Sequence, residues 1–172
     1  LEGGTKTVKS AAGKLVRWGD PERQRLSAML EQTSLFYWKG PQTTALIERV
    51  KQHHPLKYVM TCSSGTAALH IAVAAAGIGP GDEIITTGIT DHGTVVGILF
   101  QLAVPVFADL EPDTANLSVE AVERAITPRT KAILAVHLTG NPCDLHGLKA
   151  LADRHNLVLI ADCAQAWGAK FR

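Results

Sequence analysis

The sequence predicts a doubly wound α/β domain with a mostly parallel sheet and helices on both faces. From residue 57 onward, short apolar runs typical of strands alternate with longer segments typical of helices. Each connection between successive runs is long enough for a crossover helix, which favours parallel pairing and right-handed connections. Of the 172 residues, 46% are hydrophobic and 19% are charged, as in a globular domain with a real core.

The N-terminal region has a different character from the rest. Residues 1–19 show little periodicity and are predicted to form an arm, whereas residues 20–172 are predicted to form the domain itself. The first helix is predicted to run from Asp20, as its N-cap, to Gln32, with Pro21 at the first helical position.

Helices and strands are then expected to follow in order. Five apolar runs predict strands, at residues 58–62, 83–87, 104–108, 131–137 and 157–161. Helices are predicted at residues 43–50, 64–76, 90–102, 118–126 and 144–155. Ser118 and Asp144 are typical N-caps for the last two of these helices. The helix over 64–76 is rich in Ala and apolar on almost every side, so it is predicted to be buried.

Composition argues against several classes of protein. The net charge is +1 and the basic residues are scattered, so neither nucleic-acid binding nor membrane binding is indicated. No apolar stretch is long enough to span a bilayer, and residues 1–17 are too polar for a signal peptide. Cys62, Cys143 and Cys163 are far apart and odd in number, which predicts buried or semi-buried free thiols in a reducing cytoplasm and no disulfide or metal site.

The residues that follow each predicted strand form the candidate site, because doubly wound sheets bind ligands beyond the carboxyl ends of their strands. After the first strand, Ser64, Gly65 and Thr66 combine small side chains, hydroxyls and the unpaired amides of a helix start. Such a start can hold a phosphate, but an ordinary helix cap with a tight turn explains these residues equally well. Neither a Walker motif nor G-x-G-x-x-G is present, which disfavours ATP and dinucleotides.

An acidic residue follows the last predicted strand. Asp162 comes after a run of apolar residues, and a buried carboxylate is costly unless it has a partner. A cationic ring nitrogen is such a partner, and pyridoxal chemistry uses an acid in this way. Gln165, three residues later, could donate to a ring oxygen. A helix cap at Asp162 and a surface position for Gln165 are equally good interpretations of the same residues.

Histidines follow two other predicted strands. His92 could stack on a cofactor ring or transfer a proton, although a simple hydrogen bond to the neighbouring Asp91 is the commoner arrangement. His137 and Asn141 lie at one predicted rim and are expected to anchor their loop rather than to catalyse.

Six segments occur in the order, and at close to the separations, of a known family. The chain resembles the DegT/DnrJ/StrS family of fold-type I pyridoxal-phosphate (PLP) enzymes over about residues 20–172. The segments are Ser64–Leu69, Gly79–Ile85, Pro105–Asp109, Ile126–Ile133, Val136–Gly140 and Asp162–Ala166. Each segment alone is weak evidence of the resemblance, whereas six segments in the same order are strong evidence. The resemblance implies the N-terminal part of a PLP-binding large domain, incomplete in this chain.

The resemblance also implies roles for the candidate residues. Gly65 and Thr66, with Ser64 before them, would hold the cofactor phosphate. Asp162 would pair with the pyridine nitrogen, and Gln165 would contact the ring oxygen.

The chain departs from the family pattern at three points. Members usually place an aromatic at the position of Asp91 or His92, so His92 is the candidate that stacks on the ring. Ala161 stands where members usually carry Glu. The Schiff-base lysine is expected beyond Arg172, because Lys170 comes too early and has the wrong neighbours, so the 172-residue chain alone is predicted to be inactive.

The resemblance implies an activity for the complete protein. That activity is transfer of an amino group from an amino acid, such as Glu or Gln, to a keto sugar, often nucleotide-linked, or to a cyclitol. A PLP-dependent sugar dehydratase of the same family and a non-catalytic regulatory or binding protein on the same fold remain alternatives. Family members are usually homodimers, so the arm and Phe36–Trp38 are candidates for contact with a second subunit.

Overall fold

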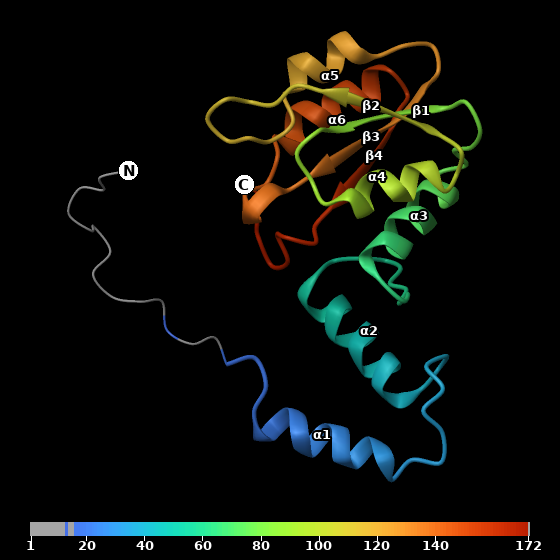
Figure 1. The fold of residues 1–172 in the computed structure, drawn as a ribbon, viewed down its shortest axis with the longest axis vertical. Helices are drawn as coiled ribbons and strands as arrows, with labels where there is room; N and C mark the ends of the chain where they lie inside the picture. Colours follow the sequence, from blue (N-terminus) through green and yellow to red (C-terminus); the bar gives the residue numbers. More distant parts are fainter. Residues whose placement is uncertain (1–12, 14–15, 172) are drawn as a thin grey trace, which may run out of the picture. The chain divides into compact units, whose positions relative to one another are not determined.

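The computed structural model describes residues 13 and 16–171 (Figure 1). Contacts divide the chain into two compact units, with the boundary between Met60 and Thr61. The first unit contains helices α1 (Asp20–Leu30) and α2 (Pro41–His53). Neither helix buries a residue, so the described part of this unit has no hydrophobic core of its own.

Both helices of the first unit begin at positions other than those predicted. Gly19, not Asp20, is the N-cap of α1, and the Glu22 carboxylate accepts the Gly19 N–H at 2.7 Å. Asp20 is instead the first helical residue, where its negative charge suits the helix dipole. Helix α2 begins at Pro41, two residues before the predicted start at residue 43, because proline fits the first turn of a helix.

The second unit confirms the predicted fold class. Four parallel strands lie in the order β2-β1-β3-β4, and helices α4, α5 and α6 connect them. Eight helices and strands described in this unit begin within two residues of a predicted start. They are α3 (Gly65–Ala75), β1 (Glu83–Thr87), α4 (His92–Leu99), β2 (Val104–Ala108), α5 (Val119–Ala125), β3 (Thr130–Val136), α6 (Leu145–Arg154) and β4 (Val158–Asp162), with the 3-10 helix η1 (Leu138–Gly140) before α6.

The predicted strand at residues 58–62 is wrong. This segment has no regular structure, and Tyr58 and Met60 are 80% and 73% exposed. A strand exists only through hydrogen bonds to a neighbour, and the four strands of the described sheet pair only with one another. An apolar, β-prone run that lacks a neighbour therefore stays irregular.

Helices α3 and α4 lie on one face of the sheet, and α5 and α6 lie on the other (Figure 1). A hydrophobic cluster lies on each face. Alternate residues of β3 point to opposite sides, so Leu134 and Val136 join the cluster that includes Val73 of α3 and Ile98 of α4. Ile133 belongs to the other cluster, under α5 and α6. Helices on both faces are thereby confirmed. None of the helices within residues 16–171 is both long and apolar enough to cross a bilayer.

Helix α3 is less buried than predicted. Only Val73 is fully buried, and Ile71 is 44% exposed. One side of α3 packs closely against α4, where a Cβ at Gly97 would lie 3.0 Å from the Leu69 Cβ. Other residues of α3, such as Ala68 and Ala75, are exposed, so an apolar sequence alone did not ensure burial.

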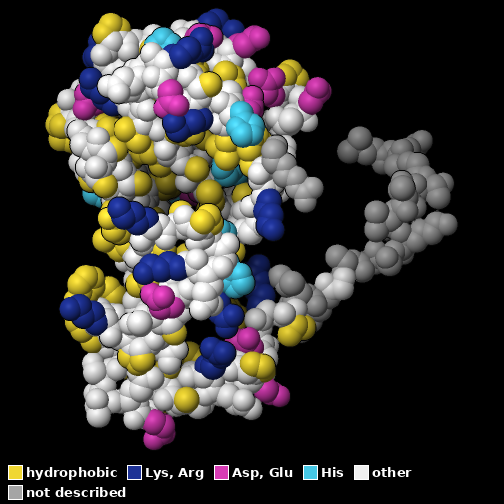
Figure 2. All heavy atoms as spheres, turned by 180° about the vertical axis from the view of Figure 1, so that it is seen from behind, with side chains coloured by type: hydrophobic (Ala, Val, Ile, Leu, Met, Phe, Trp, Pro, Cys, Tyr) yellow, Lys and Arg dark blue, Asp and Glu magenta, His cyan; other side chains and the backbone are white. Residues whose placement is uncertain are grey.

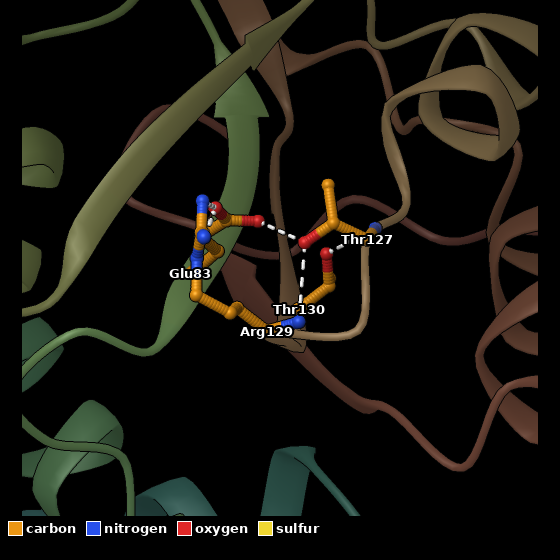
Figure 3. A network of polar contacts seen from close by, with 4 residues as sticks. All are labelled: Glu83, Thr127, Arg129 and Thr130. Carbon is orange, nitrogen blue, oxygen red and sulfur yellow. Dashed lines mark hydrogen bonds and ion pairs between the residues drawn. The ribbon is translucent and has the colours of Figure 1, made fainter.

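A polar network joins the starts of β1 and β3 (Figure 3). The Glu83 carboxylate is buried and accepts hydrogen bonds from the Thr127 hydroxyl and from two nitrogens of the Arg129 guanidinium. The Glu83 N–H donates to the Arg129 carbonyl at 2.9 Å. The hydrogen bond from Thr127, followed by the one from Arg129, lowers the pKa of Glu83 below its ordinary value. This network lies at the end of the sheet opposite the predicted ligand site.

The lowered pKa of Glu83 predicts a pH-dependent contribution to stability. The ionised carboxylate stabilises the fold above the unfolded-state pKa of about 4.3, and this contribution is lost as the pH falls toward the lower folded-state pKa. We therefore expect Glu83→Gln to unfold at lower urea concentration than the wild type near neutral pH, and the difference to shrink below about pH 4. Urea midpoints followed by circular dichroism measure it. Exposed Glu120→Gln is the control, and a difference constant with pH would contradict the prediction.

Candidate functional site

The N-terminus of α3 combines a cap with free amides. The Ser64 hydroxyl accepts the Ala67 N–H at 3.1 Å, and the Ser64 carbonyl accepts the Ala68 N–H at 3.0 Å. Within the described chain, the N–H groups of Gly65 and Thr66 donate to no protein acceptor. A Cβ added at Gly65 would meet nothing within 4 Å, so the space beside these amides is open. We call the free amides of Gly65 and Thr66 the cradle, since they can bind an anion. The sequence left a helix cap and a phosphate site as alternatives, and the two are compatible.

The first turn of α4 lies directly against this cradle. Asp91 caps α4, since its Oδ1 accepts the Gly93 N–H at 2.8 Å. A Cβ at Gly93 would lie 2.5 Å from the Thr66 Oγ1, so a larger residue at this position would force Thr66 to shift. Two helix N-termini, each with a positive dipole end, consequently meet at one place.

Asp162 ends β4 on the side of the sheet that α3 and α4 cover. Ile160, two residues earlier, belongs to the cluster on that side, and strand residues two apart share a face. The Asp162 Oδ2 accepts the Thr94 hydroxyl at 2.8 Å, and its Oδ1 accepts the Ala164 N–H at 3.0 Å. Asp162 is only 9% exposed, and no Lys or Arg of the described residues forms an ion pair with it.

Two adjacent residues of α4 link the cradle to this carboxylate. Gly93 lies against Thr66, and Thr94 donates to Asp162. Adjacent Cα atoms are about 3.8 Å apart, so the first turn of α4 contacts the cradle and the carboxylate through neighbouring residues. Gly93 and Thr94 were not among the site residues predicted from the sequence. Their only local signal is a Gly-Thr pair in the first turn of a helix that follows a strand.

Gln165 is exposed and tied to the loop after β3. Its Oε1 accepts the Thr139 N–H at 2.7 Å, which leaves the amide nitrogen of the side chain as the donor for another group. Thr139 has a φ of 52°, in the left-handed region that β-branched residues rarely adopt. Such backbone strain is common beside functional sites. The prediction that Gln165 lies at the surface is therefore correct. It did not include the hydrogen bond from the Thr139 N–H.

His92 is the first residue of α4, and its side chain is 90% exposed. The expected hydrogen bond to Asp91 is wrong, because the His92 Nδ1 lies 3.7 Å from the Asp91 Oδ1. That oxygen instead accepts the Gly93 N–H in the helix cap. The imidazole is therefore exposed, one residue away from the Gly93–Thr66 contact.

His137 anchors its loop, as predicted. It is buried, and its Nδ1 accepts the Cys143 N–H at 3.1 Å, so the neutral ring carries its proton on Nε2. Burial lowers the pKa of His137, and the charge of Asp162 opposes that shift. Asn141 contributes its backbone carbonyl, which accepts the Asn116 side-chain amide at 3.0 Å. Asn116 was not predicted, and its own Oδ1 accepts the Leu138 N–H.

Similar solved structures have the fold-type I architecture of PLP-dependent aminotransferases. The chain matches NtdA from Bacillus subtilis, solved with bound cofactor PMP, with a TM-score of 0.76 and 32% identity, over 84% of this chain and 32% of that one. Residues 18–172 match the DegT/DnrJ/EryC1/StrS aminotransferase family, and the chain belongs to that family.

Curated relatives in this family include two named aminotransferases and one named regulator. L-glutamine:2-deoxy-scyllo-inosose aminotransferase of Streptomyces kanamyceticus is 52% identical, over 72% of this chain and 29% of that protein. The pleiotropic regulatory protein of Geobacillus stearothermophilus is 42% identical, over 88% of this chain and 40% of that protein. UDP-2-acetamido-2-deoxy-3-oxo-D-glucuronate aminotransferase of Pseudomonas aeruginosa is 41% identical, over 79% of this chain and 38% of that protein. The chain thus spans less than half the length of each relative.

Proposed function

We propose that the complete protein is a PLP-dependent aminotransferase that moves an amino group from an amino acid to a keto sugar or a cyclitol. The observation that carries this proposal is the buried Asp162 carboxylate. It has no cationic partner among the described residues, and Thr94 of α4 links it to the open cradle at Gly65 and Thr66. The names of two relatives, one acting on a cyclitol ketone and one on a nucleotide-linked sugar, support the substrate class.

The residues present fit the cofactor. The amides of Gly65 and Thr66 and the Ser64 hydroxyl are donors for a phosphate, at a helix N-terminus that favours negative charge. The Asp162 carboxylate is an acceptor and counter-charge for a protonated pyridine nitrogen. The Gln165 amide nitrogen is a donor for the ring oxygen. When bound, PLP would supply the electron sink for the reacting carbon.

His92 is proposed to cover one face of the ring. Its exposed imidazole stands at the first residue of α4, next to the Gly93 that contacts Thr66. The Schiff-base lysine is proposed to lie in the protein beyond residue 172. In this proposal the described residues bind and orient the cofactor, and the lysine would move a proton between the reacting carbon of the substrate and a carbon of the cofactor.

Cofactor spectroscopy tests this proposal. The 172-residue chain and the complete gene product are each mixed with PLP, and visible spectra are recorded before and after borohydride. We expect a band that borohydride reduces only in the complete protein, and loss of that band when glutamate or glutamine is added as amino donor. If the complete protein shows no such band, the proposed activity is wrong.

A non-catalytic regulatory protein on the same fold is the second candidate, because one relative carries a regulatory name. It differs from the first in the fate of the amino donor. An aminotransferase converts glutamate or glutamine to its keto acid in proportion to the enzyme present. A regulator of this kind leaves the donor unchanged even when PLP is bound.

We also propose a homodimer. Leu35, Phe36, Tyr37 and Trp38 are each at least 59% exposed, and Figure 2 shows many other apolar side chains at the surface. Large exposed apolar groups in one segment are typical of interfaces. A cytoplasmic location is likewise proposed, because the three cysteines are free thiols. Only Cys143 is buried, whereas Cys62 and Cys163 are exposed, contrary to the prediction.

The homodimer predicts the effect of one aromatic substitution. Trp38→Ser in the complete protein should shift a dimer toward the monomer in size-exclusion chromatography with light scattering, because it removes a large apolar contact. Gln42→Ala, in the first turn of α2, is the control and should leave the dimer unchanged. A wild-type protein that elutes as a monomer at all concentrations would contradict the proposal.

A further inference from the structure

We propose that Thr94 is a positioning residue for Asp162, and that Thr90 acts behind it in a chain of hydroxyl groups. This inference rests on the proposed function. The two hydroxyls fix the plane of the carboxylate, so that it faces the cofactor's ring nitrogen.

The contacts determine the direction of each hydrogen bond. Thr94 is 1% exposed, and its Oγ1 lies 2.8 Å from the Asp162 Oδ2 and 2.9 Å from the Thr90 Oγ1. An ionised carboxylate has no proton to give, so Thr94 donates to Asp162. A hydroxyl has a single proton, so Thr90 must be the donor in its bond with Thr94. The chain therefore runs from Thr90 through Thr94 to Asp162.

This chain acts on the carboxylate in two ways. Each Asp162 oxygen accepts one hydrogen bond, from Thr94 at Oδ2 and from the Ala164 N–H at Oδ1, which prevents rotation about the Cβ–Cγ bond. Each oxygen keeps a further lone pair for a ring N–H. Hydrogen bonds to the charged form favour that form, and successive hydroxyls polarise one another, so Thr90 strengthens the effect of Thr94.

The site of Thr94 allows the hydroxyl to be removed with little change in shape. Valine replaces the hydroxyl by a methyl group of similar size, so Thr94→Val leaves the Asp162 Oδ2 without a donor while the packing is maintained. Thr94→Ser retains the hydroxyl. Thr86 gives a matched control, since it is also a fully buried threonine whose hydroxyl donates to a different acceptor, the Leu134 carbonyl at 2.9 Å.

The test uses the complete protein loaded with PLP that carries ¹⁵N in its ring. The ¹⁵N chemical shift reports protonation of the ring nitrogen, and a titration gives the cofactor dissociation constant. Measurements near pH 8 keep His137 neutral, since burial lowers its pKa. The charge of Asp162 acts on two titratable groups, His137 and Cys163. We expect Thr94→Val to shift the ring nitrogen toward its unprotonated form and to weaken PLP binding about tenfold.

The controls separate this inference from the proposed function. Thr94→Ser and Thr86→Val should keep the wild-type nitrogen signal, and Thr90→Val should shift it in the same direction as Thr94→Val but less. If Thr94→Val does not fold, the Thr90→Val signal decides. A wild-type nitrogen signal in both Thr94→Val and Thr90→Val would overturn the role of Thr94 and leave the proposed function intact. Failure of the wild-type protein to bind PLP would overturn both.

Discussion

Asp162→Asn is expected to slow amino transfer by the complete protein on the order of 10²–10³-fold, the usual effect of losing one preorganised electrostatic contact. Asn has nearly the same shape but no charge to balance a protonated ring nitrogen. It also has only one oxygen acceptor, so either the Thr94 hydroxyl or the Ala164 N–H loses its partner. The loss should therefore appear in the chemical step as well as in cofactor binding.

Stopped-flow absorbance of the first half-reaction measures this effect. The wild type and the variant, both saturated with PLP, are mixed with glutamate or glutamine, and the conversion of the cofactor is followed. Asp153→Asn is the control, because Asp153 lies exposed on α6 and pairs with Lys149 at 2.6 Å. Its rate should equal that of the wild type. Equal rates for Asp162→Asn and the wild type would show that this carboxylate does not serve the cofactor.

Leu134→Ala is expected to destabilise the chain by about 2–5 kcal/mol, the usual range for a large side chain removed from a core. Leu134 is fully buried in β3, between β1 and β4, and contributes to the cluster that α3 and α4 cover. The cavity would loosen the two helices whose first turns form the cradle. We therefore expect weaker PLP binding in the same variant, as a consequence of the lost packing.

Denaturant unfolding followed by circular dichroism measures the loss. The midpoint should fall while the slope stays the same, which indicates a change in stability and not in the extent of unfolding. Leu99→Ala is the control, since Leu99 lies on α4 and is 49% exposed; its effect should stay within about 0.5 kcal/mol. A loss below about 1 kcal/mol for Leu134→Ala would show that this part of the core repacks without cost.

The order of helices and strands in the second unit could be predicted from local patterns. Ser118 and Asp144 cap α5 and α6 as expected, because a cap depends on a side chain and an amide a few residues away. The strand at 58–62 failed for the opposite reason. Its apolar residues suit a strand, but pairing depends on a neighbour that no local pattern specifies.

The candidate site shows the same division. Ser64, Gly65 and Thr66 were identifiable because they form the start of a predicted helix, although the strand predicted before them does not form. Asp162 was identifiable because it follows a predicted strand, where this fold class binds ligands. Thr94 could not be identified from the sequence, since its contact with Asp162 spans 68 residues. The contact depends on how α4 packs on the sheet that contains β4. The cap at Asp91 likewise excluded the His92 contact that proximity in sequence favoured.

The sequence by itself determined the α/β class, most of the element boundaries and the family segments that include the cradle and the acid. Only the tertiary structure decided that the cradle and the acid meet through Gly93 and Thr94, and that two hydroxyls support the acid. The physical reason is range. Caps and hydrophobic periodicity act over a few residues, whereas contacts between α3, α4 and β4 arise only when helices pack on a sheet of defined strand order.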